Sequence, residues 1–504
     1  MEPYTYVSLG LYLLVMLGIG LYSFKQSSTD VEGYMLGGRS LSPKVTALSA
    51  GASDMSGWML MGLPGAMYVS GISSAWIAVG LVIGAYLNYL WVAPRLRVYT
   101  ELAKNALTIP DYFANRFNDS SHSLRLISSV VIVIFFTLYT SSGVVAGGKL
   151  FESSFGLSYE MGLYVTAGVV VAYTLLGGFM AVSMTDFVQG CIMFVSLVLV
   201  PVVVLFDLGG FSSAASHLAT YDADFLNLFI DASTGQAMSV IGIISLLSWG
   251  LGYFGQPHII VRFMAIRSVT DIKTARKIGI SWMVVSIIGS LATGILGLAY
   301  VTKTQGALQD PETIFIYLSQ ILFHPLISGF LLGAILAAIM STISSQLLVT
   351  SSSLTGDFYQ AFFRKNASQK ELITAGRISV ALVALVSIYL AYDRDSTILN
   401  LVSNAWAGFG AAFGPVVLIS LFWKKMTRLS AILGMLSGAI TVLIWIYAPL
   451  TINGQALSNW LYEIVPGFIV CSLTIVTFSL LGKQDDQLVS DTFEKVQHTL
   501  KQLV

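Results

Sequence analysis

The sequence predicts an all-α, polytopic membrane protein with thirteen transmembrane helices. Of its 504 residues, 55% are hydrophobic and only 10% are charged, whereas soluble domains carry about 25% charged residues. So few charges cannot cover a water-facing surface. The chain also divides into apolar segments of about 20 residues, the length at which a helix crosses the hydrocarbon core. The candidate spans are residues 5–25, 45–71, 75–98, 124–150, 160–184, 187–207, 237–262, 275–302, 325–355, 373–392, 398–423, 428–449 and 460–481.

The positions of the basic residues predict the orientation of these spans. With the N-terminus outside and thirteen crossings, 23 of the 26 Lys and Arg residues lie on the inner side, and the exceptions are Lys149, Lys303 and Arg394. Cytoplasmic loops are enriched in Lys and Arg, so the C-terminus is predicted to be cytoplasmic. The tail, residues 482–504, is predicted to be a short amphipathic helix. The first apolar run lacks a basic segment before it and is too long for a signal peptide, so we interpret it as a retained span.

Two of the spans contain glycines and polar residues in the middle of the membrane segment. In the second span these lie between Ser49 and Trp58, and in the seventh between Ser248 and His258. Glycine weakens a helix by about 1 kcal/mol and proline by about 3 kcal/mol relative to alanine. Unwound backbone at membrane depth persists only where it faces protein or a wet cavity. Both spans are therefore predicted to be discontinuous.

The two broken spans lie five spans apart, which is the arrangement of two inverted five-helix repeats that each begin with a broken helix. The predicted organisation is a single transmembrane domain. Its parts are helix 1 at 5–25, repeat one at about 42–207, repeat two at about 237–423, helices 12 and 13 at about 428–481, and the tail. Ordinary small-residue packing is the alternative for the glycines, but the paired spacing favours a binding site at the membrane midplane.

Oxygen-bearing groups near the first break suggest a cation site. Asp54 is ionisable and close to mid-span, which costs about 2.5–3.5 kcal/mol on insertion and calls for a partner, a cation or water. Its alternative role is to cap the broken helix. In the ninth span Ala338, Ser341 and Thr342 share one helix face. Their oxygens, with the backbone carbonyls of the second span, suit a hard cation such as sodium.

Carbonyls freed at Ala52 and Met55 would complete such a cation shell. Bonding of the Ser341 and Thr342 hydroxyls back to carbonyls of their own helix is the alternative interpretation. Aromatic residues near the breaks, Trp58, Tyr139, Trp249 and Tyr253, can wall a pocket for a small solute and still donate hydrogen bonds to it. Membrane-interface belts are the alternative for these rings. His258 is interpreted as a structural histidine.

At these residues the chain resembles the sodium:solute symporter family over nearly its full length, and within it the members that carry proline. The resemblance rests on several long motifs in the same order, LGGRSL at 36–41, TALSAGASDMSGW at 46–58, MGLPGA at 61–66, GGFMAVSMTD at 177–186, WGLGYFGQPH at 249–258 and ILAAIMST at 335–342. It implies the leucine-transporter fold, sodium-coupled alternating access in a bacterial cytoplasmic membrane, and L-proline as the solute.

The resemblance also implies roles for individual residues. It implies sodium binding at Ala52, Met55, Ala338, Ser341 and Thr342. For proline it implies Ser56, Gly57, Trp58, Tyr139, Trp249, Tyr253, Gln256 and Pro257. It implies supporting roles for Asp54, Asp186 and Arg39.

Four other functions are alternatives to proline symport. Another solute of the same family, such as pantothenate, a sugar or a carboxylate, is the nearest alternative. A channel is disfavoured by two broken helices around a central site, and a sensor by the short tail. An enzyme lacks a nucleophile and base set. The net charge of zero, from 26 basic and 26 acidic residues, argues against nucleic acid as a partner. The lipid bilayer, sodium and the solute are the expected partners, and no protein partner is implied.

Overall fold

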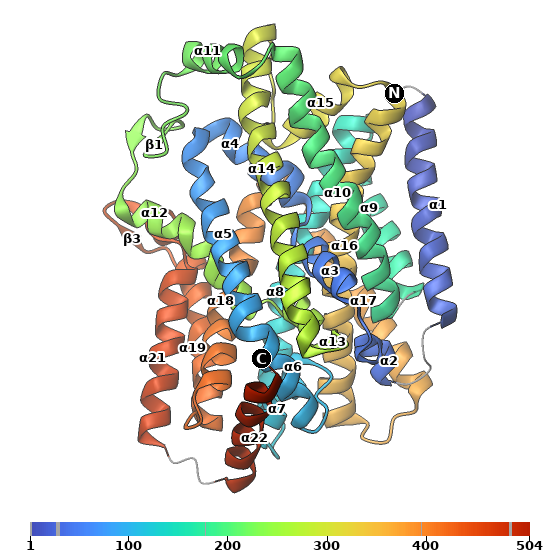
Figure 1. Cartoon of the computed structure of the whole chain (residues 1–504), viewed down its shortest axis with the longest axis vertical. Coiled ribbons are helices and arrows are strands. Elements are labelled where there is room, and N and C mark those ends of the chain that lie inside the picture. The colour runs from blue at the N-terminus through green and yellow to red at the C-terminus, as the bar shows by residue number, and fades with distance from the viewer. Residues whose placement is uncertain (1–2, 27–30, 177, 395, 483–485, 504) are drawn as a thin grey trace.

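The computed structural model describes residues 3–26, 31–176, 178–394, 396–482 and 486–503 as a single bundle of helices (Figure 1). Within these ranges, ten helices are long and apolar enough to cross a membrane. The start of α1 and the tail helix α22 lie at opposite ends of the bundle, as an odd number of crossings requires. The count of thirteen spans and the two repeat boundaries stay predictions.

The helices of the bundle differ in how deeply they are buried. The apolar stretches of α8 (Ser123–Phe155), α16 (Pro325–Ser352) and α18 (Ile398–Phe422) are 78%, 83% and 83% buried, whereas those of α1 (Pro3–Gln26) and α21 (Ile464–Leu481) are 28% buried. The first three therefore form the centre of the bundle, and α1 and α21 lie at opposite edges (Figure 1).

The second predicted span is broken, as the sequence indicated. Helix α3 (Pro43–Asp54) begins with Pro43 at its first turn, and the Ser42 hydroxyl caps it by accepting a hydrogen bond from the Val45 N–H. It ends at Met55, whose ψ of 79° is not helical. The chain resumes as a π-helical turn, η2 (Trp58–Gly62), and continues as α4 (Leu63–Ser70). The break thus falls within the glycine- and serine-rich motif, where helix propensity is lowest.

The seventh predicted span is broken too. Helix α12 (Val240–Leu247) passes into a 3-10 helix, η5 (Ser248–Gly255), then Gln256 is extended and α13 (Pro257–Ala265) begins with Pro257. A Cβ at Gly252 would overlap the Trp406 indole. This glycine therefore permits the close approach of η5 to α18 that the fold requires.

Helices between the two breaks connect the halves of the bundle. They are α5 (Ala75–Leu87), the π-turn η4 (Asn88–Val92), α6 (Ala93–Leu102), α8, α9 (Tyr159–Leu176) and α10 (Phe179–Leu208). The predicted spans 160–184 and 187–207 are wrong at their shared boundary, because α9 ends at Leu176 and α10 begins at Phe179 after the extended Gly178. Residues 179–184 are apolar, so hydropathy alone does not separate the two helices. Gly177 lies outside the described residues.

The remaining spans match their predictions within a few residues. They are α14 (Ile272–Thr304), α16 with its π-helical extension η8 (Ser353–Phe363), α17 (Gln369–Leu390), α18, α19 (Arg428–Tyr447) and α21. Short elements join the spans: α2 (Val31–Leu36), η1 (Gly37–Arg39), η3 (Gly71–Ser74), α7 (Ile109–Arg116), α11 (Phe211–Tyr221), η6 (Val269–Asp271), η7 (Pro311–Thr313), α15 (Ile314–Leu322) and α20 (Leu457–Trp460). Two antiparallel hairpins pair β1 (Ile230–Asp231) with β2 (Gln236–Ala237) and β3 (Thr451–Ile452) with β4 (Gln455–Ala456).

The tail forms the amphipathic helix α22 (Gln487–Leu503) that its sequence predicts; residues 483–485 and 504 lie outside the described residues. Val489, Phe493, Val496 and Leu500 are buried, and α22 contacts α6. The Phe493 ring lies 6.5 Å from that of Tyr99, and the Arg116 guanidinium lies 5.2 Å from the same Phe493 ring.

Candidate functional site

Four of the five residues expected to bind sodium lie together where α3 ends against α16. The Ser341 hydroxyl lies 2.7 Å from the Ala52 carbonyl oxygen and 3.1 Å from that of Ala338, and the Thr342 hydroxyl lies 3.4 Å from the Ala52 oxygen. All four residues are buried. Met55 is buried at the break itself. Two hydroxyls and two carbonyls from two helices converge here, and freed carbonyls of this kind coordinate sodium in transporters.

The Ser341 and Thr342 contacts test the alternative that these hydroxyls bond only to carbonyls of their own helix. Ser341 donates to Ala338 of its own helix, but it also reaches Ala52 across the interface. The Thr342 hydroxyl donates to the Ala52 carbonyl across the interface. Both hydroxyls therefore face α3, which is the direction that a shared ligand between the helices requires.

Asp54 lies at the centre of an aromatic cluster beside this oxygen group. Its carboxylate Oδ2 accepts a 2.5 Å hydrogen bond from the Tyr253 hydroxyl, and Oδ1 is buried with no hydrogen-bond partner in the part of the chain that the structure describes. Its backbone carbonyl accepts from Trp58 Nε1 at 3.1 Å and from the Tyr139 hydroxyl at 3.2 Å. The carboxylate does not cap the broken helix, and a buried charge of this kind calls for a cation or water.

A cavity of about 20 Å³ lies against Asp54 and is lined by Asn88 and Tyr89 of the π-turn η4. Asp54 Oδ1, Asn88 Oδ1 and the Tyr89 hydroxyl are buried and have no hydrogen-bond partner among the described residues. The space is about that of one water molecule. Binding pockets for organic ligands measure about 300–1,000 Å³, so this cavity does not hold a solute.

Three of the residues expected to bind the solute, Trp58, Tyr139 and Tyr253, meet at Asp54, and the others lie around the two breaks. Ser56 lies in the break, and its hydroxyl accepts from the Trp58 N–H at 3.4 Å. At Gly57 a Cβ would lie 2.7 Å from that of Ala146, so the segment packs tightly on α8. The Tyr139 ring lies edge-on to the His258 imidazole, with centroids 5.7 Å apart.

Trp249, Tyr253 and Gln256 of the seventh span contact α18 or the loop before α21. The Trp249 ring stacks on Tyr462 at 5.4 Å, while the Tyr253 ring lies edge-on to Trp406 at 5.0 Å. Gln256 donates to the Trp406 carbonyl at 3.1 Å, and the Trp406 indole N–H donates to the Trp249 carbonyl at 2.7 Å. Pro257 begins α13 directly after these residues.

Trp406 and Tyr462 were missed by sequence reasoning. Trp406 lies in α18, which has no break, and Tyr462 lies just before α21, so neither aromatic ring gives a local signal of function. The run of glycine and alanine around Trp406, residues 405–412, indicates close packing and is the one feature that points to it.

Asp186 belongs to a buried ion-pair network, and its partner is Arg262. Arg262 Nη2 lies 3.1 Å from Asp186 Oδ2 and 2.6 Å from the Ser345 hydroxyl, and both charged side chains are 0% exposed. The Ser49 hydroxyl donates to the same carboxylate oxygen at 2.7 Å. Arg262 is the last residue of the predicted span 237–262, and in the structure it lies within α13. The network joins α3, α10, α13 and α16.

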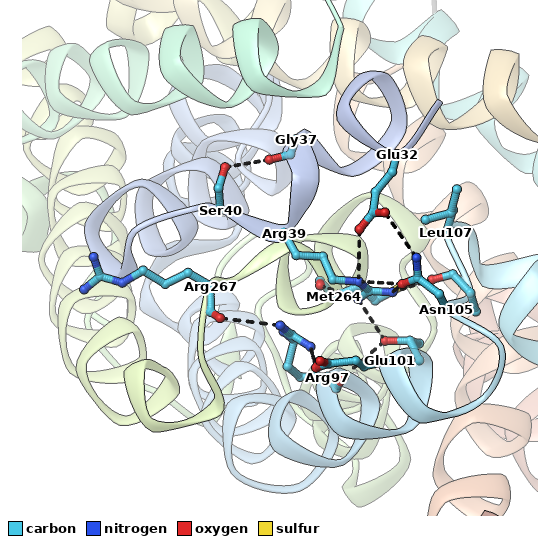
Figure 2. Close-up of polar contacts among 12 residues, drawn as sticks. Glu32, Gly37, Arg39, Ser40, Arg97, Glu101, Asn105, Leu107, Met264 and Arg267 are labelled. Atoms are coloured by element: carbon cyan, nitrogen blue, oxygen red, sulfur yellow. Dashed lines mark hydrogen bonds and ion pairs between the residues drawn. The ribbon is translucent and has the colours of Figure 1, made fainter. Parts of the chain in front are cut away.

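Arg39, which precedes α3, joins this segment to the end of α13 and to the loop after α6 (Figure 2). Its guanidinium donates to the Met264 carbonyl at 2.7 Å, the Ala106 carbonyl at 2.8 Å and the Asn105 side chain at 3.0 Å. Burial, together with the nearby Arg97 charge, lowers the pKa of Arg39 to about 10, so it stays charged at neutral pH. The loop after η1 also pairs with the end of α13, because the Leu41 N–H donates to the Ala265 carbonyl at 3.2 Å.

A second set of charged contacts lies at the other end of the site. Lys149 of α8, placed outside by the sequence, is buried and lies 2.7 Å from Glu312 and 2.9 Å from Asp310. The Glu312 carboxylate also accepts the N–H groups of Ile398 and Leu399 at the start of α18. The central cluster is thus closed on one side by Arg39 and its partners and on the other by Glu312.

Comparisons with known proteins agree with this architecture. In solved structures the chain shares its fold with a sodium-coupled sialic acid symporter, with a TM-score of 0.79, 20% identity and 95% and 98% coverage of the two chains. It also shares it with Mhp1, a nucleobase-cation-symport-1 family transporter, with a TM-score of 0.58, 11% identity and 91% and 97% coverage. The prediction of a leucine-transporter fold is confirmed.

Sequence relatives cover almost the whole chain. The osmoregulated proline transporter OpuE of Bacillus subtilis is 55% identical, over 98% of both chains. The high-affinity proline transporter PutP of the same organism is 56% identical, over 97% of this chain and 100% of the relative. A sodium/proline symporter of Staphylococcus aureus is 53% identical, over 99% and 96%. The model of the sodium:solute symporter family matches residues 34–438. On this evidence, the chain belongs to the sodium:solute symporter family.

Proposed function

We propose that this protein is a sodium-coupled secondary active symporter that imports L-proline by alternating access. The observation that supports it most is the convergence of Ala52, Ser341 and Thr342 oxygens beside the Asp54 cluster. Sodium bound there would touch both α3 and α16, so its binding would set the angle between them. The proline-specific part rests on the three relatives that are 53–56% identical.

The proposed sodium ligands are Ala52, Met55, Ala338, Ser341 and Thr342. The negative charge of Asp54 would stabilise the sodium ion electrostatically from nearby. Asp54 would not itself be a ligand of the ion. Proline is a zwitterion with a compact apolar ring. Its carboxylate would meet free N–H groups at the break, where a half-helix N-terminus favours anions, and its ring would lie on the Tyr139, Trp249 and Tyr253 faces.

The proposed location is the bacterial cytoplasmic membrane, with the N-terminus outside and the C-terminus in the cytoplasm. This assignment is supported by the distribution of Lys and Arg between the two sides. In that orientation Arg39 and Asp186 lie toward the cytoplasm, and the Lys149–Glu312 pair lies toward the outside. Opening one of these two contact groups at a time would give alternating access.

Uptake of labelled proline into liposomes that contain the purified protein tests the function. An inward sodium gradient should drive accumulation above the external concentration, and an equal potassium gradient should not. Accumulation against a gradient also separates a symporter from a channel. Displacement of bound proline by pantothenate or glucose, but not by unlabelled proline, would contradict the substrate assignment.

Thr342→Ala is expected to raise the sodium concentration needed for half-maximal uptake. The variant loses one oxygen of the proposed shell, and it should weaken proline binding mainly at low sodium, because coupling between two sites is reciprocal. The measurement is proline binding as a function of sodium concentration. Thr350→Ala, a buried threonine on the same helix that bonds to the carbonyl of Gln346, is the matched control. An unchanged sodium dependence in Thr342→Ala would show that the site is misplaced.

Tyr139→Phe is expected to weaken proline binding roughly two- to tenfold, because its hydroxyl bonds a neutral carbonyl, that of Asp54, and such a bond contributes about 0.5–1.5 kcal/mol. The measurement is equilibrium binding of labelled proline at saturating sodium. A loss well above tenfold would show that the hydroxyl moves to the proline carboxylate when the solute binds, since hydrogen bonds to charged groups are stronger.

A further inference from the structure

A long apolar groove lies on the outer surface of the bundle, away from the site described above. It has a volume of about 1200 Å³, and its walls come from α8, η8, α17 and α19. Along α17 the groove runs from Ser368 to Leu390. The span Lys370–Leu390 has 21 residues, or about 30 Å of helix. This length equals the thickness of the hydrocarbon core.

The middle of the groove is lined by apolar side chains, and its few hydroxyl groups are already hydrogen-bonded. Ile378, Leu382 and Val386 form one stripe of α17 along the groove, and they are 56%, 57% and 49% exposed. The hydroxyls of the lining residues Thr137 and Ser379 donate to carbonyls of their own helices, at 2.6 and 2.9 Å. They therefore offer the groove no free donor, and water or a polar solute would find no partner there.

The length and the lining of the groove suit hydrocarbon chains. The groove follows α17 over about 30 Å, which is the depth of both leaflets of a bilayer, so the acyl chains of one lipid would occupy about half of it. Its lining is mainly apolar, and it is open to the surface of the bundle, where lipid has direct access.

One end of the groove carries an unbalanced positive charge. Glu371 lines this end but is occupied, because Arg364 lies 3.3 Å from it and the Tyr359 hydroxyl donates to it at 2.8 Å. Lys370 is exposed beside them and has no ion pair among the described residues. Basic positions between transmembrane helices at the cytoplasmic face bind anionic lipid headgroups, and the proposed orientation places Lys370 at that face.

We propose that this groove binds an anionic phospholipid from the cytoplasmic leaflet. Its acyl chains lie along the part of the α17 stripe that is nearer Lys370, around Ile378, and its phosphate is paired with Lys370. The site is separate from the solute and sodium residues, so the proposal goes beyond the transport function and does not depend on the identity of the solute.

Native mass spectrometry of the full-length protein, purified in detergent and delipidated, tests the proposal. The probes are phosphatidylglycerol and phosphatidylcholine with the same acyl chains. Phosphatidylglycerol should bind more tightly, and Lys370→Gln should weaken it about fivefold, since one basic residue near the surface contributes about that factor. Lys425→Gln removes an exposed lysine of another inner loop, outside the groove, and should leave binding unchanged.

A second pair of variants tests the position of the acyl chains. Ile378→Trp fills the groove, whereas Ile373→Trp adds the same ring at an exposed position of α17 outside it. Ile378→Trp should lose bound lipid, and Ile373→Trp should keep it. Equal binding of the two lipids, or equal lipid retention by the two tryptophan variants, would overturn the proposal. So would a dimer that Ile378→Trp abolishes, because a second copy would then be the occupant.

Discussion

Asp54→Asn is expected to lower sodium-driven proline uptake by at least about tenfold while the protein still inserts and folds, because interactions with a buried charge contribute about 1.5–3 kcal/mol. The amide keeps the size of the carboxylate and can still accept from Tyr253, so the aromatic cluster stays intact. What is lost is the negative charge beside the proposed sodium ligands. The measurement is initial uptake in liposomes, with the amount of inserted protein determined in the same preparation.

Asp224→Asn provides the matched control, since Asp224 is an exposed carboxylate in the outer loop between α11 and β1. It should transport normally. The expected cause of the loss at Asp54 is weaker sodium binding, so raising the sodium concentration should restore part of the uptake. Near-normal transport by Asp54→Asn at low sodium would mean that the charge has no part in coupling.

The second large effect is expected from Arg262→Gln, which should destabilise the protein by about 3–5 kcal/mol, because it leaves Asp186 charged and unpaired in the interior. Asp186 already has one oxygen without a partner, and the other relies on Arg262 and Ser49. The measurement is the midpoint of thermal unfolding of the purified protein. Arg267→Gln breaks the exposed pair with Asp271 and should leave the midpoint unchanged, because surface pairs contribute little.

A double variant separates stability from function at the same pair. Replacing a buried ion pair by apolar residues of similar volume is often neutral or stabilising, so Arg262→Met with Asp186→Leu should recover much of the lost stability. If the pair only holds the helices together, uptake should recover with it. If the pair must open during the transport cycle, stability should recover and uptake should not.

The sequence predicted the broken helices well because their causes are local. Glycine, serine and proline lower helix propensity wherever they occur, so the breaks at Met55 and Gln256 follow from the residues around them. The amphipathic tail was also predictable. So was the convergence of Ala52 with Ser341, because Ala338, Ser341 and Thr342 share one helix face and Ala52 lies next to a predicted break. The boundary between α9 and α10 was not, since apolar residues continue on both sides of Gly178.

The contacts that the sequence could not reveal are those between distant spans. Trp406 contacts Tyr253 and Gln256 from 150 or more positions away, and no periodicity encodes that distance. Arg262 stands at the end of a predicted apolar span, where a charge is normally solvated, and nothing near it in the sequence shows its buried partner. Its position within α13 depends on Asp186 of another helix. Short elements such as α7 and α15 were also missed, because they are too short to stand out from the loops.

The docking of the tail helix has a consequence for the order in which the chain folds during synthesis. Arg116 and Phe493, which meet at 5.2 Å, are 377 positions apart. At about 5–20 residues per second, roughly 20–75 seconds pass between the synthesis of the first and of the second. For that period the Tyr99 and Arg116 surface has no cover from α22. The end of the bundle that α22 covers is therefore completed only after α21 has left the ribosome.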